Sequence, residues 1–134
     1  MKEIKYKAWH KEEKKMYDVA MMDLLGKRLM LTEEGKKQIV KQSIFDAVEL
    51  LEFTGKTDKG KKKLFKGDLV KWLDGKNYEI KWSDKINGFV PVEVGEKENE
   101  YDYFTDFDNG EYVGNIFKNP ELLTGNSQKN ENEN

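Results

Sequence analysis

GDLVKWLDGKNYEIKW, residues 67–82, contains two strand patterns joined by a tight turn. Residues 69–73 are mostly apolar, and residues 78–82 alternate apolar with charged side chains, as a half-buried strand does. Asp74-Gly75 between them is a strong turn signal, because glycine adopts positive φ without steric penalty. The stretch predicts an antiparallel hairpin and a mainly β fold.

Similar patterns lie on both sides of this hairpin. Residues 88–94 form a third strand pattern, in which Pro91 predicts a sheet edge or a bulge because proline cannot donate to a ladder. Residues 112–117 form a fourth. Near the N-terminus, residues 4–9 alternate between two faces and precede the apolar run 16–20, which predicts an N-terminal hairpin. Short strands at this spacing indicate a small barrel or sandwich.

Residues 24–53 give mixed signals. Residues 29–31 suggest a short strand, and residues 48–53 read as another. Val40, Ile44, Val48 and Leu51 follow the spacing of a helix face, but the branched residues among them also suit separate β segments. A short helix within residues 33–47 therefore stays an open alternative.

Composition indicates one domain with a heavily charged surface. The chain has 134 residues, with 37% hydrophobic and 37% charged side chains and no cysteine, which excludes disulfides and thiolate chemistry. No window approaches the roughly 18 apolar residues of a membrane span, so we expect a protein of the cytoplasm with no membrane contact.

We predict a single domain over residues 1–123, with an N-terminal β region (1–53) and a second region (54–123). The tail, residues 124–134, should be disordered because GNSQKNENEN, from Gly125 on, has no apolar residue that could offset its ordering entropy.

Charge is distributed unevenly. Residues 54–72 carry seven lysines against two carboxylates, whereas residues 73–134 carry six lysines against fourteen. The two segments either bind separate partners or face each other within the fold. The candidate binding residues for a polyanion are the lysines of the first segment with a ring that could stack on bases: Lys56, Lys59, Lys61, Lys62, Lys63, Lys66 and Trp72. The cluster lacks arginine, which removes the bidentate reader of bases.

Motifs that would indicate catalysis, cofactors or metals are weak. Gly55-Lys56-Thr57 ends like a phosphate-binding loop, but Leu50 stands where that loop needs its first glycine. His10, the only histidine, reads as a solvated residue of a polar turn. We therefore predict no catalytic residues, no cofactor and no metal.

Two acidic stretches follow in the second half. Residues 106–111 resemble a calcium loop only faintly, since the glycine comes one position early, and a hairpin turn is the better reading. Residues 101–107 interleave rings with carboxylates, which is typical of a core strand or of a surface for a basic protein partner.

Three blocks of sequence resemble the YopX family, small proteins carried by bacteriophages and prophages. FTGKTDKGK (53–61) continuing to FKGDLV (65–70) is similar to the family's central signature. IKYKAW (4–9) with KKMY (14–17) looks like its opening hairpin, and VGNIFKNPELL (113–123) like its closing motif. The resemblance implies a mostly β fold with an SH3-like barrel in the C-terminal half.

The resemblance implies no activity, because the family has no assigned enzymatic role. The residues expected to set structural turns are the glycines of these blocks with their polar neighbours: Gly55, Gly60, Gly67, Asp68, Gly114 and Asn115. We expect a non-enzymatic, phage-encoded binding protein that acts in the host cytoplasm on a protein partner or on itself. The alternative is a nucleic-acid-binding protein that uses the basic segment from Lys56 to Lys71.

Overall fold

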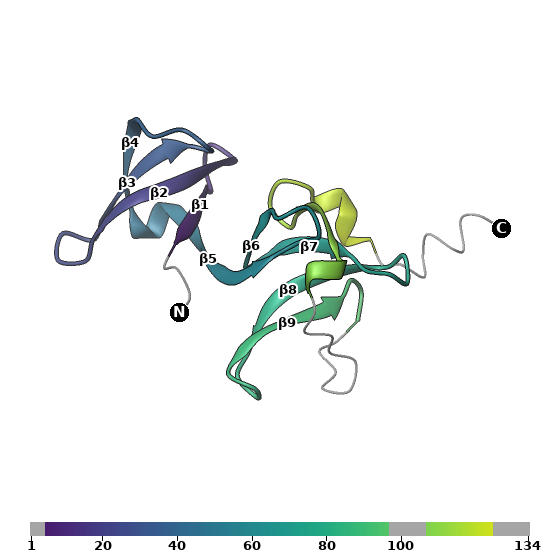
Figure 1. Cartoon of the computed structure of the whole chain (residues 1–134). Helices are drawn as coiled ribbons and strands as arrows, with labels where there is room; N and C mark the ends of the chain where they lie inside the picture. Colours follow the sequence, from purple (N-terminus) through teal and green to yellow (C-terminus); the bar gives the residue numbers. More distant parts are fainter. Residues whose placement is uncertain (1–4, 97–106, 125–134) are drawn as a thin grey trace. The chain divides into compact units, whose positions relative to one another are not determined.

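The computed structural model describes residues 5–96 and 107–124, and these residues form antiparallel strands and short 3-10 helices (Figure 1). The chain divides into two compact units, Met1–Phe53 and Thr54–Asn134. The predicted tail and the predicted ring-and-carboxylate strand, except for Thr124 and Phe107, lie outside the described residues. Whether residues 1–123 behave as a single domain stays a prediction.

A six-stranded sheet has the strand order β4-β3-β2-β1-β5-β6; its residues up to Phe53 belong to the first unit and those from Thr54 on belong to the second. Its strands are β1 (Tyr6–His10), β2 (Lys15–Asp23), β3 (Arg28–Glu33), β4 (Ile39–Ile44), β5 (Val48–Thr57) and β6 (Lys63–Phe65). The N-terminal hairpin is confirmed, with Ala8 opposite Tyr17 and Trp9 opposite Met16. The strands expected at residues 29–31 and 48–53 are confirmed as β3 and part of β5.

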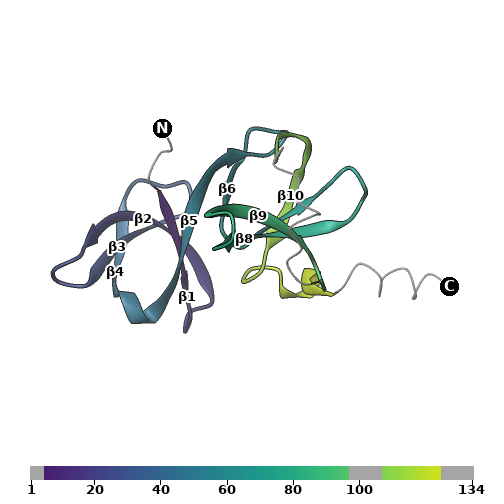
Figure 2. The ribbon, with the colours of Figure 1, turned by 90° about the horizontal axis from the view of Figure 1, so that it is seen from below.

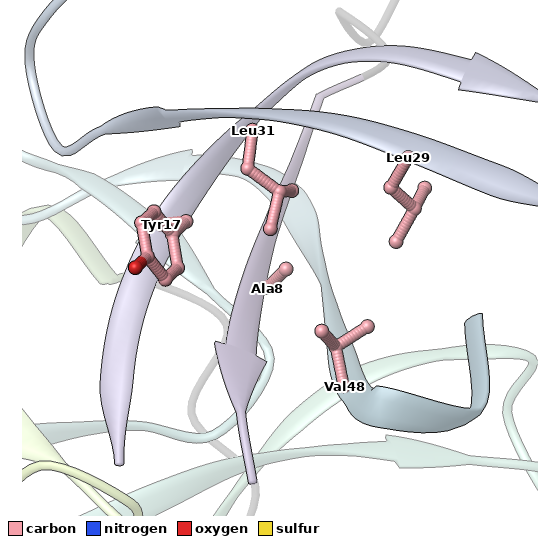
Figure 3. Close-up of a cluster of buried hydrophobic side chains, with 5 residues drawn as sticks. All are labelled: Ala8, Tyr17, Leu29, Leu31 and Val48. Carbon is pink, nitrogen blue, oxygen red and sulfur yellow. The ribbon is translucent and has the colours of Figure 1, made fainter. Parts of the chain in front are cut away.

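The core of the first unit is a cluster of five buried side chains from four strands (Figure 3): Ala8, Tyr17, Leu29, Leu31 and Val48. Leu29 and Leu31 alternate with Met30 along β3, so the two leucines face the core and Met30 faces outward. Phe45 and Ala47 pack against the cluster from the 3-10 helix η1 (Phe45–Ala47).

The helix alternative for residues 33–47 is wrong. The segment forms β4, which pairs with β3 through Leu29 opposite Ser43, and then the single 3-10 turn η1. The residues with helical spacing belong to two separate strands: Val40 and Ile44 are exposed on β4, whereas Val48 is buried on β5. Branched side chains on a strand that extends an existing sheet favour β structure over an isolated helix. The described residues contain no α-helix.

The second unit contains a four-stranded sheet with the order β10-β7-β8-β9, in which β10 is labelled in Figure 2. Its strands are β7 (Asp68–Lys71), β8 (Asn77–Ser83), β9 (Gly88–Glu93) and β10 (Glu111–Asn115). The hairpin expected around Asp74-Gly75 is confirmed, and Gly75 has φ +80°. Pro91 lies on the edge strand β9, as predicted.

The core of the second unit contains Leu64, Val70, Ile80 and Phe107. Two 3-10 helices, η2 (Phe107–Asn109) and η3 (Pro120–Leu123), flank β10 along the chain. Over the described residues, neither sheet closes on itself, so the mainly β fold is confirmed whereas the SH3-like barrel stays a prediction.

Candidate functional site: the lysine segment and the exposed apolar surface

Asp58 holds the loop at residues 58–62 of the lysine segment, which we define as residues 56–71. Its Oδ1 accepts hydrogen bonds from the backbone N–H groups of Gly60 and Lys62, both at 2.9 Å, and its Oδ2 accepts one from Tyr112 at 3.0 Å. Burial alone would raise the pKa of this carboxyl, but the three N–H donors outweigh burial and hold the pKa below its usual range. The loop is therefore attached to β10 at a fixed position.

This geometry leaves no phosphate cradle in residues 59–62, which contain three of the lysines. The backbone N–H of Lys59 donates to the carbonyl of Gly110 at 2.9 Å, and that of Lys61 donates to the carbonyl of Asp58 at 3.0 Å. With Gly60 and Lys62 bonded to the Asp58 side chain, all four amides of residues 59–62 donate within the protein. A phosphate loop needs such amides to point at its ligand.

Two of these lysines make electrostatic contacts within the second unit. Lys59 forms an ion pair with Glu111 at 3.6 Å, and the Lys62 ammonium lies 4.5 Å from the centre of the Tyr112 ring. Lys56, Lys61 and Lys66 are exposed, and the described residues place no carboxylate within ion-pair distance of them. Lys63 is half-buried in β6. A positive surface remains available to solvent.

Trp72, the predicted stacking ring, is half-buried and lies just after β7. Its backbone N–H donates to the carbonyl of Lys76 at 3.0 Å, as part of the turn that closes the β7–β8 hairpin. Lys66 precedes the other end of β7. The sequence grouped Trp72 with the lysines because they are neighbours along the chain, but an intervening strand separates it from Lys66.

The predicted turn glycines Gly67, Gly60 and Gly55 occupy three different kinds of position. Gly67 has φ +89°, donates to the carbonyl of Ile80 and accepts from the N–H of Ile116, so it joins β8 to the segment after β10. Gly60 lies in the turn that Asp58 closes. Gly55 lies inside β5 rather than in a turn, with φ +85°, a value that favours glycine.

Asp68 and Asn115 form a buried polar contact at the base of this region. Asp68 Oδ1 accepts from Asn115 Nδ2 at 3.0 Å, and Asp68 Oδ2 accepts from the Phe65 N–H at 2.7 Å. Gly114 leaves no space for a side chain, since a Cβ there would meet Asn119 Oδ1 at 2.7 Å. The quoted family blocks therefore contain three residues, Asp68, Gly114 and Asn115, that hold neighbouring segments of the second unit together.

A group of polar contacts surrounds His10 in the first unit. His10 is buried, which corrects the solvated reading, and its Nδ1 accepts from the Glu13 N–H at 3.1 Å. Glu13 also accepts from the Tyr17 hydroxyl and pairs with Lys41 at 2.5 Å. The Lys41 contact, with that of Tyr17, lowers the pKa of Glu13 to about 2, and Glu13 raises the pKa of Tyr17 to about 12. At neutral pH Glu13 is therefore ionised and Tyr17 keeps its proton.

The surface that sequence reasoning missed is apolar and lies on the first unit. We define the apolar tip as Leu24 and Leu25, in the turn between β2 and β3, which are 73% and 99% exposed. The turn is fixed by Asp23, whose Oδ1 accepts from the Gly26 N–H at 2.9 Å. The β2–β3 hairpin carries this turn away from the core cluster of its unit (Figure 1).

Exposed apolar side chains continue along the outward side of the same strands. Met21 lies opposite Met30 in the register of β2 and β3, and Ile44 lies opposite Arg28 in that of β3 and β4. Met21 and Ile44 are both more than half exposed. A signal for this surface was present in the sequence, because Leu24-Leu25 directly precedes Gly26 in a turn where polar residues are usual.

Among residues 5–96 and 107–124, no group of three or more His, Cys, Asp or Glu side chains is placed to hold a metal ion. In the same part of the chain, no helix has the length and apolar character needed to cross a bilayer.

The family model described as "YopX protein" matches residues 5–124. The chain belongs to the YopX family. The crystal structure of protein EF1440 from Enterococcus faecalis is similar, with a TM-score of 0.64 and 20% sequence identity over 92% of this chain and 99% of that one. At this identity the likeness concerns the fold alone. No protein with a curated description matches the chain.

Proposed function

We propose that this YopX protein is a non-enzymatic binding protein that contacts a protein partner through the apolar tip of its first unit. The observation that supports the proposal is the exposure of Leu24 and Leu25 on a turn held by Asp23. Leucine at a turn gains nothing for folding when it stays in water, because burial of the side chain provides about 1.5–3 kcal/mol. A partner that covers the tip would gain this free energy.

The surroundings of the tip fit a protein partner. The exposed Met21 belongs to the same hairpin, and methionine adapts to surfaces of different shape. Lys27 and Arg28 follow the tip after Gly26 and are exposed, so charged side chains border the apolar centre of the contact. Interfaces between proteins commonly have this arrangement.

Phage origin and a place in the host cytoplasm belong to the same proposal. Their support is the resemblance of the quoted blocks to phage and prophage proteins. The SH3-like barrel for residues 54–123 is likewise proposed from that resemblance, and closure of its sheet in an experimental structure would test it.

The apolar tip can be tested with a matched pair of variants. Leu24→Ser with Leu25→Ser should abolish recovery of the specific partner in a pull-down from cells that produce the protein. Leu73→Ser is the control, because Leu73 is 74% exposed but lies in the second unit. A purified partner should then bind the control protein and not the tip variant in calorimetric titration. Equal binding by both variants would exclude the tip.

A second candidate function is nucleic-acid binding through the segment from Lys56 to Lys71. It is favoured by the fixed loop that leaves Lys56, Lys61 and Lys66 exposed. Binding to phosphates would weaken steeply as salt rises, because counterions are released. We expect Lys61→Glu, Lys62→Glu and Lys63→Glu together to remove binding in fluorescence anisotropy. Substitution of Glu for Lys14, Lys27 and Lys85 together is the control and should leave most of the nucleic-acid binding.

A further inference from the structure

The six-stranded sheet ends at β4, and the outer edge of this strand is open over the described residues. β4 pairs with β3 on one side, and the strand order places no strand on its other side. Alternate N–H and C=O groups of an edge strand point away from the sheet, so they can pair with an added strand. The register with β3 shifts at Val40, which leaves the regular ladder of β4 on residues 41–44.

Apart from this shift in register, β4 lacks the features that usually protect an edge strand, such as proline or an outward-pointing charge. It contains no proline, and its only charged residue, Lys41, pairs with Glu13 at 2.5 Å. Ser43 is buried, so the alternation of the strand leaves Gln42 and Ile44 as exposed side chains. Ile44 is 57% exposed, and a branched apolar side chain favours the pairing of strands.

Exposed cations lie at both ends of β4. Lys36 and Lys37 belong to the turn that leads into the strand. At the other end, Arg28 lies opposite Ile44, and Lys27 precedes Arg28 in the turn of the apolar tip. In the part of the chain that the structure describes, no carboxylate lies within ion-pair distance of these four side chains.

The carboxylates of the same strands are engaged within the first unit. Glu33 forms an ion pair with a lysine of β2 at 3.4 Å, and Glu34 forms one with a lysine of β1 at 2.7 Å. Asp23 is the register partner of Arg28, and its Oδ1 accepts from the Gly26 N–H. An excess of positive charge therefore borders the open edge.

We propose that β4 binds an extended acidic segment of the partner protein, which pairs with its backbone as an added strand. Main-chain hydrogen bonds hold the segment, alternate apolar side chains cover Ile44, and carboxylates meet the four cations. The inference rests on the proposed function and gives its partner a stated chemistry. The contact is continuous with the apolar tip, because Ile44 lies opposite Arg28 at the tip end of β3.

A second copy of the chain fits this edge less well than an acidic segment. An antiparallel pair of β4 strands would bring Lys36 and Lys37 of one copy toward Arg28 and Lys27 of the other. Like charges at such short range oppose pairing. An acidic segment meets the same cations with opposite charge.

The first test measures anisotropy of three fluorescein-labelled peptides against the full chain: EVEVEV, KVKVKV and EEEVVV. We expect EVEVEV to bind most tightly, because it combines acidic charge with the alternation of a strand. Lys36→Glu with Lys37→Glu should weaken its binding by about 2- to 30-fold, the effect of two exposed ion pairs. Replacing all four cations by Glu should make KVKVKV the preferred peptide, a reversal that a folding defect would not produce.

The open edge itself is tested by Gln42→Glu with Ile44→Glu, which should remove binding of EVEVEV. The control is Leu73→Glu with Ile86→Glu, which adds the same charge at two exposed positions of the second unit and should keep the binding. Circular dichroism checks the fold of both variants. If EVEVEV binds no more tightly than the other two peptides, or if the edge variant binds it as the control does, the inference is wrong.

The same edge variant in the pull-down separates this inference from the function on which it rests. If it loses the partner that the apolar-tip variant also loses, both proposals are supported. If it recovers the partner while the apolar-tip variant does not, the tip binds the partner and the β4 edge does not. If neither variant loses the partner, the proposed function fails together with the inference. A dimer that the edge variant converts to a monomer in ultracentrifugation would assign the edge to a second copy and overturn the acidic segment.

Discussion

The two units differ in how deeply their hydrogen-bonded carboxylates are buried. In the second unit, Asp58 and Asp68 are buried. Asp58 accepts from the Tyr112 backbone N–H, 54 residues away, and Asp68 accepts from the Asn115 side-chain amide, 47 residues away. In the first unit, the Glu13 contacts lie at a solvent-exposed turn, and the interior is the apolar cluster around Leu29 and Leu31. Burying a carboxylate is unfavourable unless its oxygens are bonded, so those of the second unit must be essential to its loops.

This difference indicates which kind of binding surface each unit can carry. A loop held by a buried carboxylate keeps its exposed lysines in place, which suits contact with a polyanion. A sheet whose stability comes from its core can carry exposed leucines at a turn without loss of fold. The second unit therefore offers a charged surface and the first unit an apolar one.

The largest effect should come from Asp68. Asp68→Ala leaves the Phe65 N–H and the Asn115 amide without their acceptor, and we expect a loss of about 3 kcal/mol in the free energy of unfolding. Urea unfolding followed by tryptophan fluorescence measures it. Asp108→Ala is the control, because Asp108 is exposed in η2 of the same unit. If Asp68→Ala lost less free energy of unfolding than Asp108→Ala, the contrast drawn between the two units would be wrong.

Asp58 should have a smaller and more local effect. Asp58→Ala removes the acceptor of Gly60, Lys62 and Tyr112, and we expect a loss of about 2 kcal/mol, with cleavage by trypsin in residues 59–63 roughly tenfold faster or more. Because the folded-state pKa of Asp58 is lowered, its stabilisation is present at neutral pH and is lost as pH falls through that pKa. Unchanged cleavage would show that the loop is held by other contacts.

Much of the fold could be predicted because strand patterns and turn glycines are local signals. The Asp74-Gly75 hairpin, the N-terminal hairpin and Pro91 at an edge all follow from short stretches. The helix alternative for residues 33–47 failed because the pairing of β4 with β3 is a tertiary contact that periodicity does not record.

The candidate sites were harder to predict because they depend on register. Asp58 and Tyr112 are 54 residues apart, and no local pattern joins them. Trp72 is near the lysines in sequence, whereas in the fold strand β7 separates it from Lys66. His10 was read as solvated because its neighbours are polar, yet the hairpin turns its ring inward against Tyr17.

The smallest effect should come from Glu13 in the first unit. Glu13→Gln keeps an acceptor for the Tyr17 hydroxyl but removes the charge, so the pKa of Tyr17 should fall from about 12 toward its ordinary value near 10. The ultraviolet titration of each protein minus that of its Tyr17→Phe counterpart isolates this group. Glu12→Gln, at the neighbouring exposed position, should leave the pKa of Tyr17 unchanged.

Stability should respond little to the same change, because Glu13 is exposed and its contacts are screened by solvent. The raised pKa of Tyr17 means that its contribution is present below about pH 10 and is lost as pH rises through about 12. The lowered pKa of Glu13 gives the opposite dependence, since its contribution is lost as pH falls toward about 2. If Glu13→Gln destabilised the chain as strongly as Asp68→Ala, the first unit would depend on its polar contacts as the second does, and the contrast between the units would be wrong.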